Sequence, residues 1–374
     1  MKGGSERAVA VPESVADVVD HLAEAERRGD RVWPGGLGTR EPAPEGARAL
    51  STRALDGVVE YEAADLTFTA QAGTPVADIV EILAERNQWL PFDPVGWPDG
   101  TLGGLVASGV SGPLSMSYGM VRDHVLGLSV VTGDGRVLRL GGKVVKNVAG
   151  FDLVKLLVGS RGTLGVITSA TLRVFPRPDV DRVLQARATD ARALLLAGRA
   201  VATGPVMAAS VVLSGEGGGE AALSVRLHGS GATVDADERT VRRVVAGAFG
   251  GEVVIHPGST LQARTDGGGA SGGMPRTRAR VYALPTRARE ILDLIGSVAA
   301  GGVSWVVDLQ RGEWHVSMTP DEQVFSAMAR GAARLGASVS VEGTSRTHGP
   351  IEDRIRRVFD PRGLFGRGGE DVQT

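Results

Sequence analysis

Glycine residues gather in three separate stretches of the sequence, and such stretches allow the main chain itself to bind ligands. They read PGGLGT over residues 34–39, TLGGLVASG over 101–109 and GTLGVI over 162–167. Because glycine lacks a Cβ atom, its backbone can approach a ligand closely, and successive N–H groups of a glycine loop can bind one anion. Taken alone, each stretch is also consistent with an ordinary tight turn. The residues therefore leave two interpretations open, a ligand cradle and simple turning.

The first two stretches suit different parts of a ligand. Glycine fills three of the four positions 35–38, and the Thr39 hydroxyl adds a donor, which suits a phosphate group. The stretch is not the dinucleotide fingerprint, because the prolines of the following EPAPEG cannot continue a helix. The second stretch combines glycine with small residues such as Ala107 and Ser108, so a flat aromatic ring could lie against its main chain.

The elements expected around these stretches alternate between helices and strands. Apolar residues recur at helical spacing over 15–22, and Ser14 with Asp17 gives the signal of a capping box. Two strands and a helix are expected over 58–83, with Thr74 as the helix cap. A hairpin is expected over 125–140, turning at the glycines beside Asp134.

The second half of the chain follows another pattern. Over 180–345, strand and helix signals read strand, helix, two strands, helix, strand, and this order occurs twice. A glycine-rich segment over 265–275 separates the two repeats as a loop or linker. The pattern predicts an antiparallel sheet with helices on one face.

The composition excludes several classes of function. Net charge is −2 and no basic field extends over a whole domain, which argues against nucleic acid as a main partner. Cysteine is absent, and the six histidines are scattered without the spacing of metal ligands, so no metal site is expected. The N-terminus lacks the apolar core of a signal peptide, and no run approaches the roughly 18 apolar residues of a membrane span.

The order of the motifs carries a family resemblance. PGGLGT, TLGG, YGMVRDHVLGLSVVTGDG and KNVAGFDLVKLLVGSRGTLGVIT, over about residues 10–178, resemble the FAD-binding domain of the vanillyl-alcohol oxidase (PCMH) type. Within this family, SGPLSMSYGMVRDHVLG and GGKVVKNVAGFDLVKL resemble the E subunit of glycolate oxidase, and RIRRVFDPRGLFGRG resembles the family's C-terminal end. The ordered set favours the ligand cradle over simple turns.

The resemblance implies an α+β fold in which a PCMH-type FAD-binding fold of two α/β subdomains is joined to an antiparallel-sheet α+β cap. The expected domains are an FAD-binding domain over 1–178, with subdomains of about 1–95 and 96–178, a cap or substrate domain over 179–345, and a C-terminal segment over 346–374 that returns to the FAD domain. The resemblance assigns FAD contacts to Pro34, Gly35, Gly36, Leu37, Gly38, Thr39, Thr101, Leu102, Gly103, Gly104, Ser108, Gly109, Tyr118, Gly162, Thr163, Gly165, Val166 and Ile167.

The resemblance implies the FAD-binding subunit of a glycolate or 2-hydroxy-acid oxidase complex. Its substrate would be a small 2-hydroxy acid, and its partners a second flavoprotein and an iron–sulfur subunit. The FAD is expected to be non-covalent, because the chain has no cysteine and the 34–39 loop has no histidine. The expected location is the cytoplasm, with any membrane contact made through partners. A free-standing FAD-dependent alcohol oxidase and a structural FAD-binding assembly subunit stay open as alternatives.

Several other residues keep two interpretations. Arg122 could hold a substrate carboxylate or pair locally with Asp123. Lys146 and Asn147 could donate hydrogen bonds to a flavin ring, although Asn147 could instead cap the next helix. Trp97 could line the substrate or anchor its loop. We expect Asp152 to cap a helix, and we expect His124 and His315 to be structural; the catalytic residue is not identified.

Overall fold

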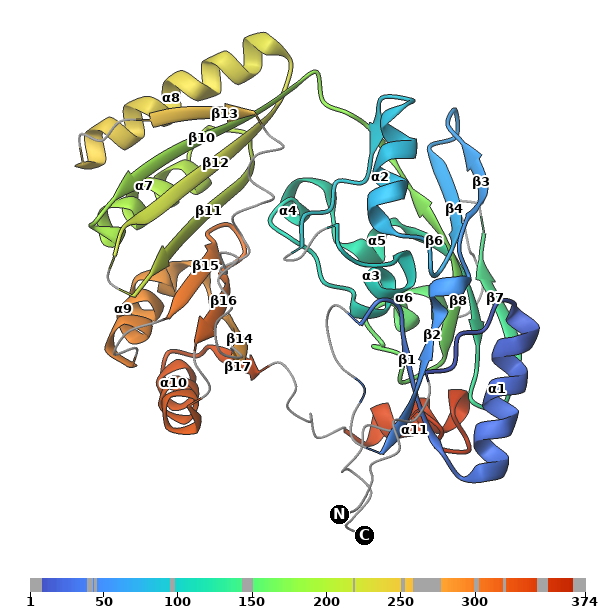
Figure 1. Cartoon of the computed structure of the whole chain (residues 1–374). Coiled ribbons are helices and arrows are strands. Elements are labelled where there is room, and N and C mark those ends of the chain that lie inside the picture. Colours follow the sequence, from blue (N-terminus) through green and yellow to red (C-terminus); the bar gives the residue numbers. More distant parts are fainter. Residues whose placement is uncertain are drawn as a thin grey trace. The chain divides into compact units, whose positions relative to one another are not determined.

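The computed structural model describes residues 9–38, 43, 46–94, 98–142, 151–217, 219–249, 253–257, 277–298, 303–318, 321–341 and 349–365. The chain divides into two compact units. Unit 1 comprises Met1–Ser115, Gly119–Arg177 and Ser345–Thr374, and unit 2 comprises Met116–Tyr118 and Pro178–Thr344. Figure 1 shows the elements of each unit.

Unit 1 combines short helices with two small sheets and one larger one. Its helices are α1 (Val15–Arg28), α2 (Val76–Ala84), α3 (Leu102–Ser108), α5 (Val121–His124), α6 (Leu153–Leu157) and α11 (Pro350–Phe359), with a 3-10 turn at Thr52–Ala54. Its strands are β1 (Arg31–Gly35), β2 (Ala47–Ser51), β3 (Val58–Glu62), β4 (Thr67–Gln71), β5 (Gln88–Trp89), β6 (Val125–Val131), β7 (Val137–Gly141), β8 (Val166–Arg173) and β9 (Phe175–Pro176).

The sheets of unit 1 join segments that are distant in sequence. β1 and β2 form a parallel pair, and β5 pairs with β9. The five-stranded sheet has the order β3-β4-β8-β6-β7, and all its pairs are antiparallel. This sheet takes β3 and β4 from before residue 95 and the other three strands from after it. Its two faces bury separate apolar clusters, because side chains alternate along β8: Val166 lies in one cluster and Ile167 in the other.

Local signals explain where the helices of unit 1 begin. Ser14 accepts a hydrogen bond from the Asp17 N–H, and the Asp17 carboxylate accepts one from the Ser14 N–H, so the predicted capping box is confirmed. Asp152 caps α6 by accepting from the Lys155 N–H at 3.1 Å, also as predicted. The prediction for Thr74 was wrong. Its hydroxyl exchanges hydrogen bonds with the backbone of Gly57 and does not cap α2.

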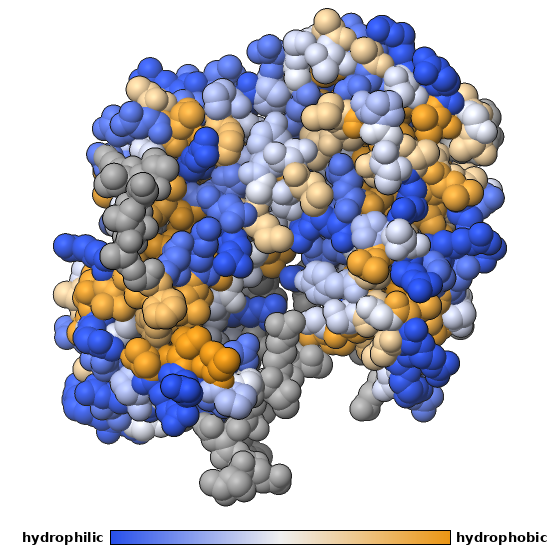
Figure 2. Space-filling view, turned by 180° about the vertical axis from the view of Figure 1, so that it is seen from behind, coloured by the Kyte–Doolittle hydropathy of each residue, from blue (hydrophilic) through white to orange (hydrophobic). Residues whose placement is uncertain are grey.

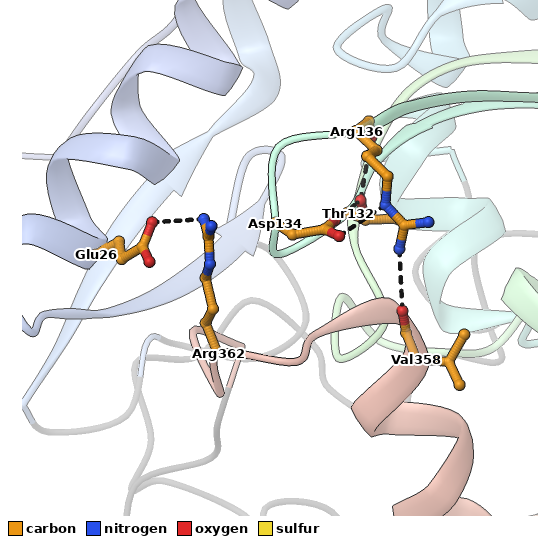
Figure 3. Close-up of polar contacts among 6 residues, drawn as sticks. All are labelled: Glu26, Thr132, Asp134, Arg136, Val358 and Arg362. Carbon is orange, nitrogen blue, oxygen red and sulfur yellow. Dashed lines mark hydrogen bonds and ion pairs between the residues drawn. The ribbon is translucent and has the colours of Figure 1, made fainter.

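The C-terminal segment packs onto the beginning of unit 1. In Figure 3, Arg362 pairs with Glu26 of α1, and Arg136 of the β6–β7 hairpin donates to the Val358 carbonyl at 3.1 Å. The Val32 N–H donates to the Leu364 carbonyl, and the buried Phe365 joins the apolar cluster around α1. Residues more than three hundred positions apart therefore share one core.

Unit 2 consists of one large sheet with helices. Its elements are α4 (Ser115–Tyr118, of which Met116–Tyr118 belong to this unit), β10 (Val180–Ala188), α7 (Ala191–Thr203), β11 (Ala208–Glu216), β12 (Ala221–Gly229), α8 (Gly231–Phe249), β13 (Val253–Pro257), β14 (Thr277–Tyr282), a 3-10 turn (Pro285–Arg287), α9 (Ala288–Val298), β15 (Ser304–Asp308), β16 (Glu313–Met318), α10 (Glu322–Arg334) and β17 (Ser338–Val341). The eight-stranded sheet has the order β13-β10-β12-β11-β15-β16-β14-β17, with antiparallel pairs throughout.

The two faces of this sheet differ in character. Figure 1 shows helices α7 to α10 on one side of the strands. Residues such as Leu223, Val225 and Leu227 of β12 point into the core on that side. The alternate residues of β12, Arg226 and His228, therefore lie on the opposite face. The predicted fold class, an α+β chain with an antiparallel-sheet cap, is confirmed by this architecture and by the solved structures described below.

The face of the molecule drawn in Figure 2 is mixed in polarity. Figure 2 shows hydrophilic residues over much of the face in view, with apolar residues between them. Among the described helices, none is long and apolar enough to cross a membrane.

Candidate cofactor site and a buried polar network

The structure brings the first two glycine stretches into contact. Gly35 ends β1, and Gly36 follows it against the side chain of Thr101, the residue that precedes α3. A Cβ atom on Gly36 would overlap the Thr101 hydroxyl. This hydroxyl is also held in place, because it accepts the Gly104 N–H at 3.2 Å and so caps α3. The glycine at position 36 is therefore required by the close approach of the two segments.

In the loop after β1, two carbonyl groups accept hydrogen bonds from side chains of the protein, and two N–H groups donate to no described residue. The Gly36 carbonyl accepts from the Ser51 hydroxyl at 2.8 Å, and the Gly35 carbonyl accepts from the Thr52 hydroxyl at 3.3 Å. Within the described part of the chain, the N–H groups of Leu37 and Gly38 donate to no acceptor. Both residues are exposed. Open N–H groups beside occupied carbonyls fit an anion such as a diphosphate.

The second stretch is a short helix packed closely on its neighbours. The Gly103 N–H donates to the Ala72 carbonyl at 2.7 Å, and a Cβ atom on Gly103 would lie 2.8 Å from the Ala72 Cβ. Gly109 ends α3 with φ at +59° and lies against Gly159. The glycines at 103 and 109 are thus explained by packing and by turn geometry.

The third stretch touches the first. A Cβ atom on Gly162 would lie 3.4 Å from the ring of Pro34, so the turn after α6 lies beside the β1 loop. The Thr163 hydroxyl donates to the Ser160 carbonyl and fixes this turn. Gly165 has φ at +155° and packs against Val130 and Val131 of β6, which leaves no room for a side chain. Val166 and Ile167 are buried in the core, so their side chains are not exposed to a ligand.

Thr39, Trp97, Lys146 and Asn147, which the sequence also singled out, lie outside the described residues. Tyr118 is described, and it belongs to unit 2. Its hydroxyl lies 2.8 Å from Nδ1 of His228.

Tyr118 stands at one end of a polar network on unit 2. Nε2 of His228 lies 3.0 Å from Oδ1 of Asp181, and Arg226 binds both oxygens of Asp181, at 2.8 and 2.6 Å. Cross-strand register creates the network, since Asp181 of β10 lies directly opposite His228 of β12. The side chains of Arg226 and His228 are almost fully buried.

Charge and burial shift the pKa values of two residues in this network, Asp181 and Tyr118. Burial opposes the charge of Asp181, but the hydrogen bonds from Arg226 and His228 outweigh it and hold the pKa of Asp181 below its usual range. Burial raises the pKa of Tyr118 above that of a free tyrosine. The network therefore holds a fixed carboxylate at one end and a neutral phenol at the other.

A second buried carboxyl lies at the turn between β15 and β16. Asp308 accepts the N–H groups of Gln310 and Arg311 through Oδ1, at 2.9 and 3.1 Å. Burial raises its pKa to about 6, in spite of these hydrogen bonds. Among the described residues, its Oδ2 atom has no hydrogen-bond partner.

The sequence analysis named Tyr118 but missed Asp181, Arg226, His228 and Asp308. The available signal was the segment SVRLHG over 224–229, in which polar and apolar residues alternate. This alternation places Arg226 and His228 on the same face of a strand. Asp181 could not be paired with them without the register of β10 on β12. The described residues contain no cluster of three or more side chains suited to a metal ion.

The first part of the chain is similar to known FAD-binding proteins. The sequence family described as "FAD binding domain" matches residues 7–141, which include the first two glycine stretches. Glycolate oxidase subunit GlcE of Escherichia coli (strain K12) is 45% identical over 136 residues, covering 36% of this chain and 39% of that protein. Glycolate oxidase subunit GlcD of Bacillus subtilis (strain 168) is 32% identical over 183 residues, covering 48% of this chain and 39% of that protein.

Two further comparisons extend this result. D-2-hydroxyglutarate dehydrogenase of Xanthomonas citri pv. viticola is 34% identical over 181 residues, covering 47% of this chain and 38% of that protein. The matches thus span about two fifths of the length of these relatives. A solved structure of alkyldihydroxyacetonephosphate synthase shares the fold, with a TM-score of 0.75 at 16% identity over 95% of this chain and 76% of that one.

Proposed function

We propose that this chain, a PCMH-type FAD-binding protein related to glycolate oxidase subunits, is the FAD-carrying subunit of a 2-hydroxy-acid oxidase complex. The observation that carries the proposal is the convergence of three glycine-rich segments in unit 1. Gly36 lies against Thr101, and Pro34 lies beside Gly162. The names of the relatives, which include glycolate oxidase subunits and a D-2-hydroxyglutarate dehydrogenase, support hydroxy acids as the substrate class.

The main chain of unit 1 would hold the cofactor. The open N–H groups of Leu37 and Gly38 suit the diphosphate of FAD, and Thr101 fixes the position of the loop that carries them. The main chain of 102–109 and 162–167 would contact the remainder of the cofactor. When bound, FAD supplies a two-electron acceptor for a hydride from the carbon that bears the substrate hydroxyl.

The attachment of FAD is proposed to be non-covalent. Cysteine and histidine side chains can form covalent bonds to a flavin. The chain has no cysteine, and residues 34–39 contain no histidine. A second flavoprotein and an iron–sulfur subunit are the proposed partners, which would carry electrons onward. The proposed location is the cytoplasm, with any membrane association made through these partners.

Anaerobic reduction of the purified protein by glycolate and by D-lactate tests the proposal. We expect flavin absorbance at about one FAD per chain, released intact by denaturation because it is not covalently attached. We expect little bleaching by either acid for the chain alone and full bleaching after partner subunits are added. Bleaching of the chain alone would indicate a free-standing dehydrogenase. FAD that is never reduced, even in the complex, would indicate a structural assembly subunit.

A further inference from the structure

We propose that Asp308 carries a proton on Oδ2 that it donates to Oε1 of Gln310, and that loss of this proton releases Gln310 from β11. The site is a pH-sensitive switch within unit 2, at the turn between β15 and β16. It is carried by two buried oxygen atoms of this turn, Oδ2 of Asp308 and Oε1 of Gln310, which have no hydrogen-bond partner among the described residues. The inference is independent of the proposed function, because it needs neither FAD nor a substrate.

The other polar atom of each side chain is bound to the protein. Oδ1 of Asp308 accepts the N–H groups of Gln310 and Arg311, at 2.9 and 3.1 Å. Nε2 of Gln310 donates to the Ala208 carbonyl of β11 at 3.4 Å. Because the N–H group of Gln310 is bound to the Asp308 carboxyl, the glutamine side chain starts beside that carboxyl.

The two buried oxygens each require a donor, because a buried acceptor without a hydrogen bond costs the free energy of its desolvation. Both atoms are almost inaccessible to water, which leaves little room for a bridging water. A Ca²⁺ or Mg²⁺ ion takes about six ligands, and the described residues hold no cluster of side chains suited to a metal ion. A single proton on Oδ2 is sufficient, because it makes this atom a donor and leaves Oε1 as its acceptor.

The surroundings of Asp308 favour its protonated form. Glu313 of β16 lies directly opposite Asp308, and Val212, its neighbour on β11, is uncharged. Arg311 opposes this effect, but its guanidinium pairs with Glu313 at 2.8 Å. Burial is the largest influence and raises the pKa of Asp308 to about 6. The proton is therefore gained and lost near pH 6.

The negative charge of Glu313 is held in place by its other neighbours. Burial opposes this charge, but the hydrogen bond from His315 and the charge of Arg311 lower the pKa of Glu313. Arg280 of β14 acts in the same direction, and Tyr282 of β14 lies opposite Glu313. A fixed charge therefore faces Asp308 when it gains or loses its proton.

Ionisation of Asp308 changes what the Gln310 amide must do. An ionised carboxyl needs a donor at Oδ2, and the amide supplies one by a half turn about its terminal bond. The same half turn takes Nε2 away from the Ala208 carbonyl, so the contact between Gln310 and β11 is lost. The protonated form keeps both hydrogen bonds, one from Asp308 to Gln310 and one from Gln310 to Ala208.

The lost contact lies at an irregular part of the sheet. The pairing of β11 with β12 shifts register between Ala208 and Ser210. Between them, the Ala209 carbonyl accepts the Ser117 hydroxyl at 3.1 Å, which binds the segment Met116–Tyr118 to unit 2. Loss of the proton should therefore loosen the start of β11 at the place where this segment is attached.

Nuclear magnetic resonance of the full-length protein tests the switch directly. The side-chain N–H₂ signals of Gln310, assigned from Gln310→Met, should shift with a midpoint near pH 6, and Asp308→Asn should abolish this shift. Gln185 is the matched control, because its Nε2 donates to the Ser224 hydroxyl at 3.3 Å on the same sheet and its signals should not move. The Asp308 carboxyl carbon of the wild type should titrate with the same midpoint.

Hydrogen exchange gives a second readout. The Leu309 N–H donates to the Val211 carbonyl at 2.9 Å, next to the contact that is lost. Its protection factor should fall about fivefold between pH 5 and pH 7.5, which corresponds to the loss of one hydrogen bond. In Asp308→Asn the protection factor should stay constant over this range.

The outcomes that overturn the inference need no variant that might unfold. Asp308 carboxyl and Gln310 amide signals that do not titrate together near pH 6 in the wild type would contradict the shared proton. Movement of the Gln185 signals equal to that of Gln310 would indicate a general change of the fold and would also contradict it. Failure of flavin reduction would contradict the proposed function and leave these measurements unaffected.

Discussion

The two units place their polar groups in opposite ways. In unit 1, the polar groups where the glycine-rich segments meet are mainly main-chain amides, such as those of Leu37 and Gly38. In unit 2, the corresponding groups are charged and titratable side chains on the sheet face opposite the helices. A main-chain site depends on close packing of backbone segments. A side-chain site depends on buried charges being paired. Unit 1 should therefore lose stability when apolar packing is removed, and unit 2 when a buried charge loses its partner.

The first way to test this contrast is to remove an apolar anchor of unit 1. Phe365→Ala should lower the free energy of unfolding by about 3–5 kcal/mol, because a fully buried ring is replaced by a cavity in the cluster around α1. Urea unfolding followed by tryptophan fluorescence measures the change. Arg362→Ala is the control in the same segment. It removes a surface pair with Glu26 and should cost less than about 1 kcal/mol. Equal effects of the two variants would contradict the role given to the apolar anchor.

Removal of a buried charge in unit 2 should have the next largest effect. Arg226→Met leaves Asp181 without its main partner and should cost about 3 kcal/mol in unfolding free energy. Arg187→Met is the matched control on the same sheet, because Arg187 pairs with Glu220 where both side chains are exposed, and it should cost less than about 1 kcal/mol. If the two losses proved equal, burial of the Arg226–Asp181 pair would have no energetic consequence.

A smaller effect with a defined pH dependence is expected at Asp308. Its pKa in the folded protein, about 6, is higher than the unfolded value of 3.8, so the carboxyl favours the folded state at low pH and this contribution is lost as pH rises through about 6. Asp308→Asn keeps an oxygen acceptor without the charge. It should raise the unfolding free energy by about 2–3 kcal/mol at pH 8 and change it little at pH 4.

Urea unfolding of Asp308→Asn and wild type at the two pH values measures this difference. A stabilisation that is the same at pH 4 and pH 8 would show that Asp308 does not titrate in this range. A variant less stable than the wild type at pH 8 would show that the carboxylate charge is favourable in the fold.

Much of the fold could be predicted from local signals, and the side-chain network could not. Ser14 and Asp152 cap helices as predicted, because a cap depends on residues three positions away. The hairpin of β6 and β7 and the twofold strand–helix order of unit 2 also follow from local periodicity. Thr74 was wrongly predicted to cap α2, because its hydroxyl is hydrogen-bonded to the backbone of Gly57, which is distant in sequence. Tyr118 was named from the sequence, but its hydrogen bond to His228 required the fold, because the two residues are 110 positions apart.

The central claim is that the close approach of Gly36 to Thr101 builds the FAD site, and FAD content of purified variants tests it most directly. The wild type should carry about one FAD per chain, and Gly36→Val should lose at least nine tenths of it, because the side chain would displace the Thr101 hydroxyl from the loop. Gly247→Ala, on α8 where a Cβ atom meets open space, should retain full occupancy. Full occupancy in Gly36→Val, or a wild type that binds no FAD when FAD is supplied, would contradict the account.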